Sequence, residues 1–161
     1  MQNYIGSHIA GMSMNDTLTA DMKTAMKAKD KLALTTIRAL KSAIKNAAIE
    51  QGGADTVLDD IAIISIIRKQ VKQRHDSIEQ FNKANRPELS ENEQNEINVL
   101  EKYLPTAMTA DEINAAVAEV VAETGAASRA DMGKVMGLLQ KKTDGRADGK
   151  ILSQAVMKAL S

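Results

Sequence analysis

Apolar residues recur at steps of three and four along most of this chain, which is the spacing that places them on one face of an α-helix. Within residues 30–51 this stripe consists of Leu34, Ile37, Leu40, Ile44 and Ala47. Nowhere do β-branched residues alternate with polar ones between turn signals, as they do in a half-buried strand. The pattern therefore predicts an all-α protein.

Glycines, prolines and capping residues divide the pattern into about seven helices. Gly52 and Gly53 end one helix, and Thr109 with Glu112 forms a capping box that opens another. Pro87 suits the first turn of a helix. The predicted helices span about 15–29, 30–51, 58–85, 87–103, 110–124, 129–142 and 148–160.

Pro105 stops the fourth helix just before that capping box, so residues 105–108 are the expected linker. We predict an N-terminal bundle of about four helices over residues 13–107 and a small three-helix domain over 108–161. Residues 1–12 contain Gly-Ser-His and are expected to be a tag or a disordered N-terminus.

Charge and composition limit the kinds of ligand and partner that the chain is expected to bind. The 21 basic and 21 acidic residues balance, so nucleic-acid binding requires a local basic patch. Cysteine is absent and there are two histidines, so we expect no metal and no cofactor. No apolar run approaches the roughly 20 residues that cross a bilayer. We therefore expect no membrane partner and a cytoplasmic location.

Two groups of basic residues are candidates for binding a phosphate backbone. The first follows one line along the second predicted helix, and the second surrounds the loop before the last helix. A solvated lysine face with no ligand explains the same pattern. The candidate nucleic-acid-binding residues are Arg38, Lys41, Lys45, Lys134, Lys141, Lys142, Arg146 and Lys150.

Gly133 and Gly137 lie four residues apart, on one face of the sixth predicted helix. Because glycine weakens a helix, something is expected to offset its cost. Close packing of a neighbouring helix is the favoured interpretation. The approach of a ligand or an RNA backbone is the alternative.

Arg74 falls within the apolar arc of the third predicted helix, where a lone guanidinium would be costly to bury. The acidic fourth helix offers Glu93 and Glu96 as partners. We predict a structural ion pair between these two helices.

Known catalytic motifs are missing from the sequence. It contains no phosphate-binding glycine loop with its lysine, no nucleophile elbow and no paired zinc histidines. No catalytic residue is assigned.

Several separated segments resemble the YqeY-like proteins, also grouped as the GatB/YqeY family. They are 25–30, 37–45, 73–78, 100–105, 132–137 and 145–149, and the likeness extends over about 13–161. One departure is Asn85, where relatives commonly have glycine. The resemblance implies that the C-terminal part is similar to the tail domain of GatB, a subunit of tRNA-dependent amidotransferases, which is implicated in holding tRNA.

The resemblance implies a non-catalytic accessory protein that binds tRNA, an aminoacyl-tRNA synthetase or an amidotransferase. A protein-protein adaptor without RNA contact is the alternative. The family is also associated with carbon-nitrogen ligase activity that uses glutamine as amido-N-donor. Because no glutaminase or ATP site is recognisable, we expect no independent activity of this kind.

Overall fold

A computed structural model describes residues 11–161 of the chain. That part holds seven α-helices and one 3-10 turn, with no strand, so the all-α prediction is confirmed. The expected tag or disordered segment falls on residues 1–10, outside the described residues, and on Gly11 and Met12.

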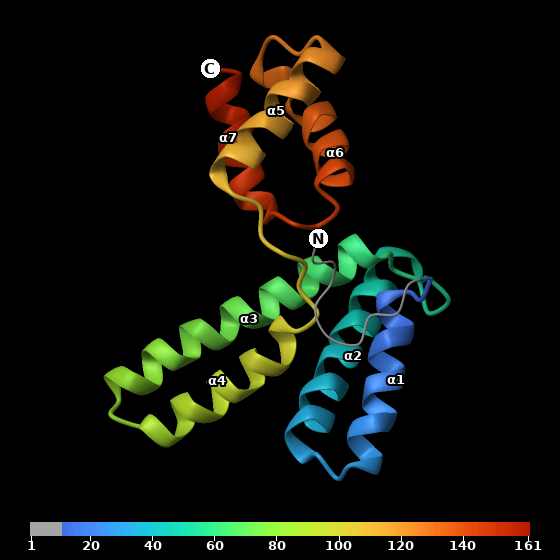
Figure 1. The fold of residues 1–161 in the computed structure, drawn as a ribbon, viewed down its shortest axis with the longest axis vertical. Coiled ribbons are helices and arrows are strands. Elements are labelled where there is room, and N and C mark those ends of the chain that lie inside the picture. The colour runs from blue at the N-terminus through green and yellow to red at the C-terminus, as the bar shows by residue number, and fades with distance from the viewer. Residues whose placement is uncertain (1–10) are drawn as a thin grey trace. The chain divides into compact units, whose positions relative to one another are not determined.

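The chain divides into two compact units, and the boundary lies between Leu104 and Pro105. Unit 1 contains four helices, which Figure 1 shows in blue to yellow. They are α1 (Met14–Lys27), α2 (Lys31–Gly52), α3 (Asp60–Lys83) and α4 (Pro87–Glu101). Unit 2 contains α5 (Ala110–Thr124), the 3-10 turn η1 (Arg129–Asp131), α6 (Met132–Thr143) and α7 (Gly149–Ala159).

Polar side chains start the first three helices of unit 1. Ser13, Asp30 and Asp59 each accept a hydrogen bond from a backbone N–H in the first turn of the helix that follows. These bonds satisfy donors that a helix leaves unpaired at its start. Pro87 occupies the first turn of α4, where its missing N–H costs nothing.

The four helices of unit 1 form two antiparallel hairpins, α1 with α2 and α3 with α4, and both contribute to one core. Fully buried aliphatic side chains such as Leu40 of α2, Ile67 of α3 and Ile97 of α4 meet there. Burying a side chain of this size stabilises the fold by about 1.5–3 kcal/mol. Aliphatic burial therefore holds the two hairpins together.

Two hydrogen bonds link distant parts of unit 1. The Met14 N–H donates to Asp60 Oδ1 at 2.8 Å, joining the starts of α1 and α3. The Tyr103 hydroxyl donates to Asp21 Oδ2 at 2.6 Å, joining the end of α4 to α1. Burial raises the pKa of Tyr103, and the bond to Asp21 raises it further, so this phenol stays protonated and remains a donor.

The turn between α3 and α4 depends on a residue with positive φ. Asn85 adopts φ 55°, in the left-handed region that glycine and asparagine tolerate best. The departure from glycine at this position therefore keeps the turn, and α3 ends at Lys83.

Unit 2 is held by a smaller core, in which Val120 of α5, Leu139 of α6 and Leu152 of α7 are buried. The predicted capping box of Thr109 and Glu112 opens α5. The helix predicted to begin at residue 129 instead starts with η1, and α6 begins only at Met132.

Candidate nucleic-acid interface

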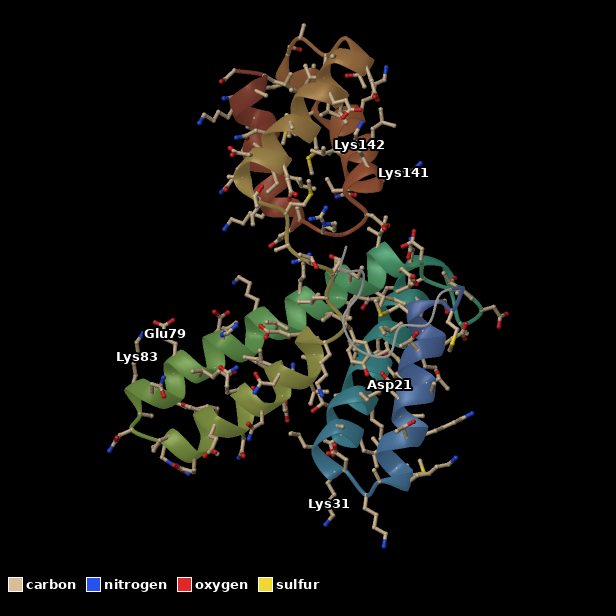
Figure 2. All side chains as sticks on the ribbon, in the orientation of Figure 1. Asp21, Lys31, Glu79, Lys83, Lys141 and Lys142 are labelled. Atoms are coloured by element: carbon tan, nitrogen blue, oxygen red, sulfur yellow. The ribbon has the colours of Figure 1, made fainter. Side chains whose placement is uncertain are left out.

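The outward face of α6 presents two lysines, two glycines and a leucine. At 100° per residue these positions fall away from Val135 and Leu139, the buried residues of the same helix. All of them are exposed, and they comprise Gly133, Lys134, Gly137, Leu138 and Lys141. Figure 2 shows Lys141 extending away from the α6 ribbon.

The two glycines of α6 do not serve packing within unit 2. A Cβ atom added to Gly133 or to Gly137 would meet no heavy atom within 4 Å. The favoured interpretation, close packing of a neighbouring helix, is therefore wrong within unit 2. Both glycines face open space because the buried face of α6 lies on its other side.

Lys142 is engaged within unit 2. Its Nζ pairs with Glu119 and, at 3.5 Å, with Glu123, both on α5. The hydrogen bond with Glu119 raises the pKa of Lys142 and keeps it charged. Adjacent lysines thus differ: Lys142 turns toward α5, whereas Lys141 has no ion pair in the described part of the chain.

Arg146 is also tied to its own unit. Its Nε donates to the Thr106 carbonyl oxygen at 2.9 Å, and its Nη2 lies 3.4 Å from Glu112 Oε2. The Met108 N–H donates to the Arg146 carbonyl oxygen at 3.4 Å. Arg146 therefore fastens the segment before α5 to the loop before α7.

The start of α7, beside the second group of candidate basic residues, is capped by its own chain. Asp148 Oδ1 accepts from the Lys150 N–H at 3.2 Å. A carboxylate thus already occupies the place of an anion at this helix N-terminus. The Lys150 side chain is exposed and remains available.

The three candidate basic residues of α2 differ in their exposure to solvent. Arg38 and Lys45 are exposed, whereas Lys41 is partly buried. Lys41 Nζ donates to Thr19 Oγ1 at 2.7 Å and to Asn15 Oδ1 at 3.3 Å, both on α1. Burial lowers the pKa of Lys41, and the charge of Asp16 offsets part of that effect.

Arg74 lies where the sequence placed it, between α3 and α4. Its Nε donates to Glu96 Oε2 at 2.8 Å, with the Arg74 side chain 13% exposed and the Glu96 side chain 29% exposed. Gln70 accepts two further hydrogen bonds from the guanidinium. Glu93 makes no ion pair among the described residues, so the structure brings only Glu96 to Arg74.

Sequence reasoning did not single out Leu138, which is 41% exposed on the α6 face. A helical wheel supplies the signal, since Leu138 falls about a quarter-turn from the buried stripe. Over residues 11–161 we find no group of three or more His, Cys, Asp or Glu able to hold a metal ion. In the same residues no helix is both long and apolar enough to cross a membrane.

The sequence matches the family described as Yqey-like protein over residues 15–160. Curated relatives carry the name "Altered inheritance of mitochondria protein 41, mitochondrial". The protein from Pyrenophora tritici-repentis is 36% identical over 149 residues, covering 89% of this chain and 78% of its own. The protein from Lachancea thermotolerans is 46% identical over 109 residues, covering 66% of this chain and 57% of its own.

These names contradict the expected cytoplasmic location, since the relatives are mitochondrial proteins by name. The expectation rested on the lack of an apolar span, a property that does not distinguish one aqueous compartment from another. The match with the Lachancea thermotolerans protein spans little more than half of that relative's length. The family match covers nearly the whole chain, from α1 to the end of α7, and on this ground the chain belongs to the YqeY-like family.

Proposed function

We propose that this protein is a non-catalytic, tRNA-associated accessory protein, and that unit 2 contacts the RNA with the outward face of α6. The observation that carries the proposal is the exposed pair Gly133 and Gly137, which serve no close packing within unit 2. Each glycine costs a helix about 1 kcal/mol relative to alanine. A partner that approaches the helix backbone closely offsets this cost.

Charge on the same face suits a phosphate backbone. Lys134 and Lys141 stand on either side of Gly137 and carry no ion pair within the described residues. Each lysine that neutralises a phosphate releases a counterion and adds to the affinity at low salt. RNA of helical shape is bound mainly through such backbone contacts.

The other candidate nucleic-acid-binding residues contribute less to the proposed RNA contact or not at all. Lys150 is exposed in the same unit, and Arg38 and Lys45 are exposed in unit 1. Lys41, Lys142 and Arg146 already donate to oxygens of their own unit. Lys142 and Arg146 pair with carboxylates of their own unit, and Lys41 is partly buried against α1, so we leave these three out of the proposed RNA contact.

Exposed apolar side chains support a second function, an adaptor that docks on an aminoacyl-tRNA synthetase or an amidotransferase. In unit 2 they are Leu138, Ile151 and Met157. Such residues contribute to protein interfaces when they are buried by a partner. Carbon-nitrogen ligase activity with glutamine as donor has no comparable support, since the sequence contains no recognisable glutaminase or ATP site.

Salt-titrated binding of total tRNA to the full chain tests the proposal. Wild-type affinity is expected to fall steeply with salt. Lys134→Glu combined with Lys141→Glu is expected to weaken binding about tenfold or more and to lower the salt slope by roughly two. The matched control is Lys23→Glu with Lys27→Glu, which changes the charge equally at two exposed lysines of α1.

Equal affinities for the two double variants contradict the assigned face. Absent binding, or binding that ignores salt, contradicts the RNA function itself and favours the adaptor. Circular dichroism of each variant checks that the helices remain folded.

A further inference from the structure

A pocket of about 410 Å³ opens in unit 1 between α1, α2 and the segment that joins α2 to α3. Its volume lies in the range of sites that hold small ligands. None of its lining residues belongs to unit 2, so it is separate from the α6 face. The residues that line it include Asn15, Lys41, Lys45, Ala54, Val57 and Ile63.

Local sequence explains how this pocket forms. α2 ends at Gly52, and a Cβ there would lie 2.6 Å from Thr56 Oγ1. Glycine therefore lets the joining segment fold back against the end of the helix. Gly53 follows with φ 103°, a backbone conformation that glycine adopts without strain.

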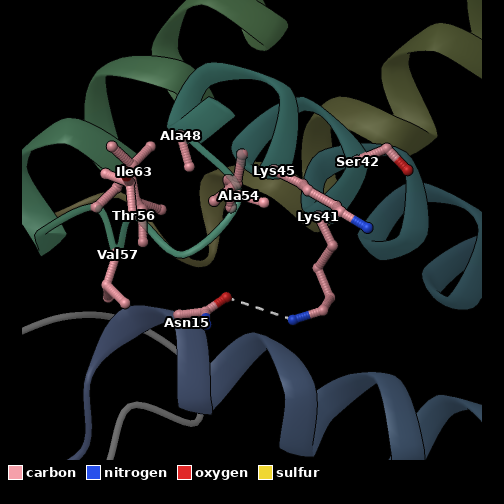
Figure 3. A pocket seen from close by; sticks show the side chains of 11 residues that line it. Asn15, Lys41, Ser42, Lys45, Ala48, Ala54, Thr56, Val57 and Ile63 are labelled. Atoms are coloured by element: carbon pink, nitrogen blue, oxygen red, sulfur yellow. Dashed lines mark hydrogen bonds between the residues drawn. The ribbon is translucent and has the colours of Figure 1, made fainter. Parts of the chain in front are cut away.

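The two sides of the pocket differ in chemistry. Figure 3 shows Lys41 and Lys45 on one side, with Thr56, Val57 and Ile63 on the other. The apolar side includes Ile63, which is buried, and Val57, which is 83% exposed at the rim. A ligand with one charged end and one apolar end matches this division.

The two lysines carry positive charge that no carboxylate neutralises by direct contact. Lys41 and Lys45 lie one helical turn apart on the same face of α2. Lys41 Nζ is held by the neutral oxygens of Thr19 and Asn15, and neither lysine makes an ion pair in the described part of the chain. Burial lowers the pKa of Lys41, which an anion in the pocket would reverse.

We propose that this pocket binds a small organic anion, with its charged head group at Lys41 and Lys45 and a short apolar body against the aliphatic side. Ser42 and Asn15 provide further hydrogen-bonding groups for the head group. Carboxylates and phosphate monoesters share this chemistry. The proposal does not depend on tRNA binding, because the pocket and the α6 face share no residue.

Nuclear magnetic resonance titration of the full chain tests the pocket with four probes: hexanoate, hexyl phosphate, hexylamine and inorganic phosphate. Saturable amide shifts at Ser42, Ala48 and Thr56 are expected with hexanoate or hexyl phosphate. Whichever binds more tightly identifies the head group. Hexylamine is expected to cause no such shifts, because its charge repels both lysines. Inorganic phosphate is expected to bind more weakly, because it lacks the apolar body.

Two variants locate the bound anion. Lys45→Gln is expected to weaken binding about tenfold, the loss typical of one charge-assisted hydrogen bond. Ala54→Phe places a large side chain at an exposed lining position and is expected to reduce binding without changing any charge. Lys31→Gln is the matched control, since it removes an exposed lysine of α2 about 21 Å along the helix from Lys45.

Absence of saturable shifts with both hexyl anions overturns the proposal. Equal weakening by Lys45→Gln and Lys31→Gln also overturns it, because the anion then responds to overall charge alone. Shifts of equal size with hexylamine overturn the assignment of an anion. The dispersion of the amide spectrum reports whether each variant is folded.

Discussion

Unit 1 and unit 2 consist of similar aliphatic helices but are stabilised differently. Unit 1 buries fifteen hydrophobic residues in one cluster among the described residues, whereas the cluster of unit 2 has nine. Unit 1 adds contacts between distant positions, such as Tyr103 with Asp21 and Arg74 with Glu96. Unit 2 also has contacts between distant positions, such as Arg146 with Thr106 and Lys142 with Glu119, so the two units differ mainly in the size of their cores.

The difference in core size matters because the unit with the smaller core contains Gly133 and Gly137, which serve no close packing within that unit. Glycine in a helix lowers stability most noticeably where the core contributes least. Unit 2 nevertheless has both Gly133 and Gly137 on one exposed face. This combination favours a surface kept for a partner over a surface that serves the fold.

Truncating one buried leucine in each core is expected to change the stability of the two units to different extents. Leu40 in unit 1 and Leu139 in unit 2 are both essentially unexposed, so replacing either with alanine should cost about 2–5 kcal/mol. A unit the size of residues 105–161 has about 3–8 kcal/mol to lose. We expect Leu139→Ala to remove most of the stability of unit 2 and Leu40→Ala to remove a smaller share of the stability of unit 1.

Urea titration followed by amide resonances of each unit measures this difference, because one global signal would mix two transitions. If both units lose structure together in both variants, they unfold as one body and the comparison between two cores fails.

The next largest effect is expected at the ion pair between α3 and α4. Arg74→Met leaves a partly buried Glu96 carboxylate without its partner, and we expect a loss of about 1–2 kcal/mol after allowance for solvent at Glu96. Glu93→Gln is the control, since Glu93 lies on the same helix but makes no ion pair among the described residues.

A double-mutant cycle of Arg74→Met with Glu96→Gln isolates the pair from the packing of the arginine stem. A coupling free energy near zero in urea unfolding would mean that the arginine contributes only its packing and its bonds to Gln70.

Local pattern predicted most of the fold, because helix starts and stops depend on residues close in sequence. Asp148 capping α7 and Thr109 capping α5 both lie next to the helices that they open. The link between Tyr103 and Asp21 spans 82 residues, and no spacing rule indicates it. Such pairings depend on how hairpins meet, which local periodicity does not encode.

Candidate site residues were less predictable for a related reason. The sequence makes both Lys141 and Lys142 candidates for binding, and only the position of Glu119 on a neighbouring helix distinguishes them. The pocket beside Lys41 was missed because its other side comes from the segment after Gly53. Charge pattern on one helix cannot reveal what a different segment places against it.

The smallest expected change in stability concerns the glycines themselves and has the opposite sign. Replacing Gly133 or Gly137 with alanine should stabilise unit 2 by about 0.5–1 kcal/mol. The added Cβ has open space around it, and alanine loses less conformational entropy than glycine when the helix folds. The control is Gly125→Ala, which should destabilise the same unit, because Gly125 ends α5 with φ 66°. Urea unfolding of unit 2 measures both. A unit 2 that becomes more stable but binds tRNA more weakly would mean that the glycines serve the partner, whereas unchanged tRNA binding would remove the main support for the α6 face.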